Sequence, residues 1–81
     1  MEAIKLKSYL KIAAECLRDL GEIPAGHLYA SLMCNGVTLP DYQIIEDCLC
    51  KVLGVKKDRS HMLTWTKRSE TIFNKVKAQV W

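Results

Sequence analysis

The chain has 81 residues, of which 49% are hydrophobic and 26% are charged, and its net charge is +3. This length predicts one domain over residues 1–81, and this composition excludes a chain that is largely disordered. No run is apolar enough for a membrane span or a secretory leader, so we expect a cytoplasmic protein with no membrane partner.

The basic residues gather toward the end of the chain. Residues 54–81 carry seven bases and two acids, whereas residues 41–53 carry more acids than bases. A basic third of a small domain is typical of proteins that bind nucleic acid or another polyanion, but it also serves solubility alone. Charge by itself leaves both interpretations open.

The four cysteines raise the questions of disulfides and zinc. A reducing cytosol favours free thiols, and Cys48 and Cys50 stand two apart in a helical pattern, where they point to different sides rather than to one metal ion. We therefore expect no metal, although His27 and His61 are available, and no cofactor. Cys16 and Cys48 are expected to be buried, and Cys50 is expected to be the most reactive thiol. The sequence has no nucleophile with an adjacent base and no glycine-rich phosphate loop, so we do not expect an enzyme.

Two helices are predicted in the first half of the chain. Apolar residues recur at spacings of three and four over about residues 2–20 and again over about 24–34. Gly21 ends the first helix, and Pro24 makes Ile23 extended before it starts the second.

A third helix is predicted to begin near Thr38 and Pro40 and to end at Gly54. Its buried side is expected to consist of Ile44, Ile45, Cys48, Leu49, Val52 and Leu53. After Gly54 the apolar period falls toward two, which predicts a β-hairpin with a polar connection of four or five residues. Thr66 or Ser69 can then cap a last helix.

The core is predicted from the apolar stripes of these elements. Its expected members are Leu10, Leu17, Leu28, Leu32, Ile45, Leu49, Val52, Leu63 and Trp65.

The fold class is therefore mainly α with a small β-hairpin. This order of elements resembles the winged helix-turn-helix domain, here with an extra C-terminal helix. The phrases at residues 23–33 (IPAGHLYASLM), 42–45 (YQII) and 61–65 (HMLTW) are similar to a small winged-helix family of prokaryotic phages and mobile elements. A four-helix domain with an incidental hairpin is the alternative.

The resemblance implies a DNA-binding module, such as a small transcriptional regulator, whose third helix enters the major groove and whose hairpin contacts phosphates. Carried over to this sequence, it implies that double-stranded DNA is contacted by Gln43, Lys51, Lys56, Lys57 and Arg59. The bases that follow, Lys67 and Arg68, are expected to add to this DNA binding.

Acidic residues on the outer side of the third helix oppose this interpretation, because carboxylates repel the phosphate backbone. The alternative is a winged helix used for protein binding, such as a phage accessory protein that inhibits a host nucleic-acid machine. Its host-protein partner would then be contacted by Glu46, Asp47 and Cys50.

The last helix carries an apolar stripe that needs a covering surface. We expect this surface to be a second copy of the chain, in a homodimer formed through Ile72, Phe73, Val76 and Val80. Folding back on the first helix of the same chain is the alternative.

Overall fold

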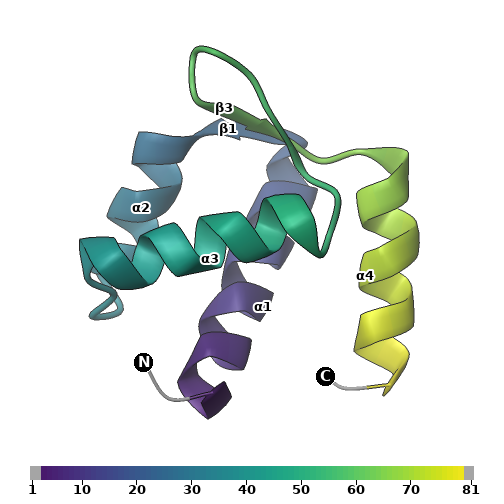
Figure 1. Ribbon diagram of the computed structural model, residues 1–81, viewed down its shortest axis with the longest axis horizontal. Coiled ribbons are helices and arrows are strands. Elements are labelled where there is room, and N and C mark those ends of the chain that lie inside the picture. Colours follow the sequence, from purple (N-terminus) through teal and green to yellow (C-terminus); the bar gives the residue numbers. More distant parts are fainter. Residues whose placement is uncertain (1–2, 80–81) are drawn as a thin grey trace.

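The computed structural model describes residues 3–79, which form four helices joined by a small sheet (Figure 1). In chain order the elements are α1 (Ala3–Leu20), β1 (Glu22–Pro24), α2 (Ala25–Met33), α3 (Leu39–Lys51), β2 (Lys56–Lys57), β3 (Met62–Thr64) and α4 (Lys67–Gln79). The predicted class, mainly helical with a hairpin, is confirmed.

Local signals in the sequence set the ends of the helices. Gly21 directly follows α1 and has a φ of 82°, and its N–H donates to the Leu17 carbonyl at 2.7 Å. Pro24 stands in extended conformation just before α2. Thr38 is the N-cap of α3, where its carbonyl rather than its side chain accepts the Tyr42 N–H at 2.9 Å. These helix ends lie within a few residues of those predicted.

The sheet has one more strand than the hairpin that the sequence predicts. Its order is β1-β3-β2 and both pairings are antiparallel, with Ile23 opposite Leu63 and Lys57 also opposite Leu63. Two further bonds bracket the β1–β3 pair, from the Ala25 N–H to the His61 carbonyl and from the Trp65 N–H to the Gly21 carbonyl, both at 2.8 Å. The extended segment before α2 is therefore an edge strand that holds the hairpin against the helices.

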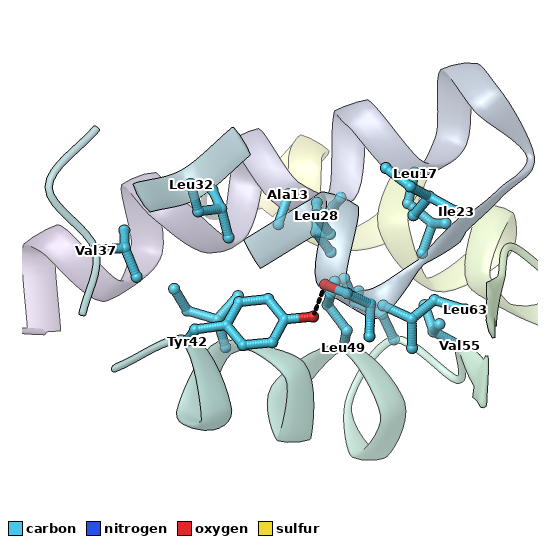
Figure 2. Packing of buried hydrophobic residues seen from close by; sticks show 14 residues of the cluster. Ala13, Leu17, Ile23, Leu28, Leu32, Val37, Tyr42, Leu49, Val55 and Leu63 are labelled. Carbon is cyan, nitrogen blue, oxygen red and sulfur yellow. Dashed lines mark hydrogen bonds between the residues drawn. The ribbon is translucent and has the colours of Figure 1, made fainter. Parts of the chain in front are cut away.

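The core lies between α1, α2, α3 and the inner side of the sheet (Figure 2). Six predicted core residues are buried, namely Leu17, Leu28, Leu32, Ile45, Leu49 and Leu63. Tyr42, which the sequence analysis did not place in the core, is also buried, and its hydroxyl donates to the Ala25 carbonyl at 3.0 Å. Burial raises the pKa of this phenol.

Four predictions of burial need correction. Val52 is 55% exposed and Ile44 is 44% exposed, although both were expected on the buried side of α3. The inward stripe is instead Tyr42, Ile45 and Leu49, and it continues into Leu53 after the helix has ended at Lys51. Leu10 and Trp65 are only partly buried, at the margin of the cluster.

Reciprocal hydrogen bonds cap α4. The Ser69 N–H donates to Thr66 Oγ1 at 3.0 Å, and the Thr66 N–H donates to Ser69 Oγ at 3.2 Å. Both capping residues that the sequence suggested therefore act together.

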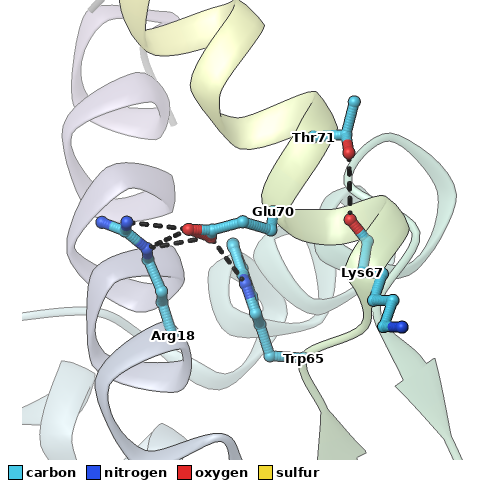
Figure 3. Close-up of polar contacts among 5 residues, drawn as sticks. All are labelled: Arg18, Trp65, Lys67, Glu70 and Thr71. Carbon is cyan, nitrogen blue, oxygen red and sulfur yellow. Dashed lines mark hydrogen bonds and ion pairs between the residues drawn. The ribbon is translucent and has the colours of Figure 1, made fainter.

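A polar cluster attaches α4 to α1 (Figure 3). The Arg18 guanidinium approaches both oxygens of Glu70, with Nε at 2.8 and 2.9 Å and Nη2 at 2.7 Å from Oε1, and the Trp65 indole donates to the same carboxylate at 3.2 Å. Phe73 lies beneath this cluster, with its ring centroid 5.5 Å from that of Trp65 and 5.5 Å from Arg18 Cζ.

The apolar side of α4 is partly buried within its own chain, and this weakens the case for a homodimer. Phe73 is 0% exposed within its own chain, so it has no surface left for a second copy. Ile72 and Val76 are partly buried in the same way, whereas Val80 lies outside the described residues. At Phe73 the stripe instead contacts Arg18 of α1 and Trp65 of its own chain, in line with the alternative in which it folds back on the first helix.

None of the described helices is both long enough and apolar enough to cross a membrane.

Candidate nucleic-acid interface

The hairpin projects from the helices at the end opposite the start of α1 (Figure 1). Its connection, residues 58–61, has the predicted length of four residues. Asp58 organises this connection, because its Oδ1 accepts the Ser60 N–H at 2.8 Å and the Met62 N–H at 3.0 Å. Arg59 is exposed at the tip. The hairpin therefore presents a basic side chain on a turn that hydrogen bonds hold in shape.

The two lysines of β2 point to opposite faces of the sheet, as successive strand residues do. Lys57 lies opposite the buried Leu63 and faces α3, whereas Lys56 lies opposite Thr64 on the outer face. Lys57 Nζ is 2.8 Å from Glu46 Oε1. This hydrogen-bonded carboxylate raises the pKa of Lys57.

This ion pair joins two residues that the sequence analysis assigned to different partners. Lys57 was expected to contact phosphate, and Glu46 was expected to repel phosphate or to contact a protein. Only 13% of the Glu46 side chain is exposed. The pair therefore neutralises one of the two acids of α3 that were expected to oppose DNA binding, and it also occupies one base of the hairpin.

Cys50 belongs to the same half-buried region of α3. Burial raises the pKa of its thiol, and the Glu46 carboxylate raises it further, while Lys57 lowers it in part. The expected protein-contact group of Glu46, Asp47 and Cys50 is thus not one exposed face. Among the three, Asp47 is exposed, whereas Glu46 and Cys50 are partly buried.

The outer side of α3 carries a row of three exposed polar residues. Gln43, Asp47 and Lys51 are each four positions apart and so lie on one stripe of the helix. Exposed Ile44 and Val52 flank this stripe. The row is close to neutral, because one acid and one base are present.

The start of α4 joins the base of the hairpin. Thr66 Oγ1 donates to the Gly54 carbonyl at 3.2 Å, and the Arg68 side chain passes so close that a β-carbon on Gly54 would lie 3.2 Å from its Cδ. Gly54 also has a φ of 70°, a conformation that favours glycine, and any β-carbon there would require a small shift of the Arg68 side chain. Lys67 and Arg68 are exposed here.

The described residues contain no group of three or more His, Cys, Asp or Glu side chains that could hold a metal ion. All four cysteines are free thiols, and Cys34 is the exposed one. Cys16 and Cys48 are partly rather than fully buried.

Two features of this region were missed by the sequence analysis. The direction of Lys57 could have been predicted, because in a strand Val55 and Lys57 lie on one face and Lys56 lies on the other. A lysine on the same face as buried Val55 suggests a carboxylate partner. The bonds that Asp58 accepts also have a signal, because aspartate commonly bonds backbone two residues onward.

Searches against protein-family models, curated proteins and solved structures give no match to this chain.

Proposed function

We propose that the protein is a winged helix-turn-helix domain that binds double-stranded DNA, as small transcriptional regulators do. The order α1-β1-α2-α3-β2-β3 and the sheet order β1-β3-β2 support this proposal, because they place a projecting hairpin beside a helix with an open outer side. In this arrangement α3 enters the major groove and the hairpin follows the phosphates.

The observation that carries the proposal is the ion pair between Lys57 and Glu46. It cancels an acidic charge on the side of α3 that the hairpin adjoins, while other bases near the hairpin and the helix ends stay exposed. Within residues 3–79 none of these bases makes an ion pair: Lys51, Lys56, Arg59, Lys67 and Arg68. Asp47 is the exposed acid that still opposes a polyanion.

Fluorescence anisotropy of a labelled duplex across a salt series tests the proposal. We expect dissociation constants of about 1–100 µM on unrelated sequences at physiological salt, and a steep loss of affinity as salt rises. Arg59→Ala and Lys67→Ala should each flatten the slope of log K against log salt by about 0.9, because each removes about one phosphate contact.

Lys7→Ala is the matched control, since Lys7 is an exposed base in the N-terminal half of α1, away from the hairpin. It should leave the slope unchanged. Asp47→Asn should strengthen binding, because it removes the exposed acid. The proposal fails if the wild-type protein does not bind duplex DNA at low salt, or if Lys7→Ala weakens binding as much as Arg59→Ala.

A protein partner is the second candidate function, and the exposed apolar residues near α3 favour it. Leu39 and Ile44 on α3 and Val52 directly after it are 49%, 44% and 55% exposed. Such a surface suits a protein contact better than a phosphate contact. A pull-down from lysate treated with nuclease separates the two functions, since an Ile44→Ser variant should lose a captured protein while it still binds DNA.

A further inference from the structure

We propose that Asp58 is a positioning residue for DNA binding, which fixes the hairpin tip in the shape that presents Arg59 to a phosphate. The inference rests on the proposed function. The inference gives Asp58 a favourable effect on DNA binding, whereas its negative charge alone would weaken binding.

The tip is organised around this one residue. Its carboxylate accepts the Ser60 and Met62 N–H groups, its own N–H donates to the Met62 carbonyl at 3.2 Å, and its carbonyl accepts the His61 N–H at 3.1 Å. Arg59 stands inside this set of bonds, directly after Asp58. The position of the Arg59 backbone therefore depends on Asp58 more than on any contact of Arg59 itself.

The backbone conformation of His61 shows that the turn contains a residue in an unfavourable conformation. Its φ of 60° is left-handed, which residues other than glycine seldom adopt. The hydrogen bonds to Asp58 compensate for this backbone strain, and they let Met62 enter β3 in register. Without the carboxylate, the connection would have no side-chain acceptor for two N–H groups near its tip.

A preorganised tip strengthens binding because less conformational freedom is lost when Arg59 meets a phosphate. The negative charge acts in the opposite direction. A unit charge about 8 Å from a phosphate in water changes the affinity for DNA by about twofold. Loss of the Arg59–phosphate contact should therefore weaken binding more than removal of the Asp58 charge strengthens it. Geometry and charge thus predict changes of opposite sign, and substitution can separate them.

Three substitutions separate the two effects. Asp58→Asn keeps an oxygen acceptor at the same position and removes the charge, so DNA binding should strengthen by about twofold. Asp58→Ala removes both, and binding at 0.1 M salt should weaken on the order of fivefold through the loss of the Arg59 contact. Asp58→Glu keeps the charge but misplaces the acceptor, and it should weaken binding at least as much as Asp58→Ala.

Repeating the substitutions in an Arg59→Ala protein shows whether Asp58 acts through Arg59. In that background Asp58→Ala should no longer weaken binding, and it should strengthen binding slightly because only the charge effect remains. Amide hydrogen exchange at Ser60 and Met62 should accelerate in Asp58→Ala and stay slow in Asp58→Asn. Thermal melting of each variant verifies that the helices remain folded.

The outcomes distinguish this inference from the proposed function. If the wild-type protein does not bind duplex DNA, both are overturned. If it binds and Asp58→Ala binds equally well or better, only the role of Asp58 is overturned. The same holds if Asp58→Ala weakens binding equally with and without Arg59.

Discussion

Leu49 lies in the last turn of α3 and Val52 directly follows the helix, yet the two residues have opposite environments. Leu49 is 0% exposed in the centre of the core, whereas Val52 is 55% exposed just after the helix ends. The spacing of apolar residues allows either Val52 or Leu53 to face the core, because both are apolar. Where the helix ends decides between these two residues. The turn at Gly54 makes that decision by directing Leu53 into the core.

We predict that Leu49→Ala lowers the free energy of unfolding by about 2–5 kcal/mol, because it leaves a cavity in the core. Val52→Ala, directly after the same helix, is the matched control and should change it by less than about 0.5 kcal/mol. Urea denaturation followed by circular dichroism measures both. Equal losses in the two variants would contradict the burial that distinguishes these residues.

The thiols are also distinguished by their surroundings rather than by their spacing. The sequence analysis expected Cys50 to be the most reactive thiol. In the structure, burial and Glu46 raise the pKa of Cys50, so less of the reactive thiolate forms.

We predict that Cys34, the exposed cysteine, reacts first with iodoacetamide at neutral pH. Mass spectrometry of a digest taken at early times should locate the first label on Cys34, and a Cys34→Ser protein should be labelled much more slowly. Faster labelling of Cys50 than of Cys34 would show that this half-buried part of α3 opens readily.

At the scale of elements, the helices and the hairpin could be predicted because their signals are local. Gly21, Pro24 and Gly54 mark ends that the backbone must respect wherever the segments pack. The strand formed by Glu22–Pro24 could be predicted only as extended chain, because its partner β3 is distant in sequence. The Lys57–Glu46 pair could not be located for the same reason, although the alternation along β2 shows that Lys57 faces inward.

The attachment of α4 to α1 depends on ionised Glu70, and this gives a pH dependence. The Arg18 hydrogen bonds lower the pKa of Glu70 below its ordinary value of 4.5, and the Trp65 indole adds to the effect. A lowered folded-state pKa stabilises the protein at pH values above the ordinary one, and this contribution is lost as the pH falls through the folded value.

We therefore predict that Glu70→Gln destabilises the protein at neutral pH, and that the difference from wild type narrows as the pH falls below about 4.5. Urea denaturation at a series of pH values between neutral and 3 measures this difference. In an Arg18→Met background the difference at neutral pH should shrink. A difference that stays constant with pH would mean that the Glu70 charge does not contribute to the attachment.

For the whole molecule, the covering of α4 bears on self-association. The case for a homodimer depended on an apolar stripe without a neighbour, and Phe73 in that stripe is buried by its own chain. A chain that acts singly would recognise an asymmetric DNA site, whereas a symmetric pair would require two half-sites.

We predict that sedimentation equilibrium gives the mass of one chain over a hundredfold range of concentration. Phe73→Ala should then lower the thermal midpoint equally at low and high protein concentration, because the residue acts within one chain. A midpoint that rises with concentration, or a sedimenting mass of two chains, would restore the dimer interface.

The place of β3 at the centre of the sheet has a consequence for folding kinetics. It can pair with β2 through a short connection, but its other neighbour, β1, precedes it by the whole of α2 and α3. Closing so long a loop is entropically unfavourable until the hairpin residues are available. The side of the sheet that carries Ile23 and Leu63 of the core is therefore complete only once β3 has paired with β1. Folding should then proceed in a single exponential phase, without a stable helical intermediate.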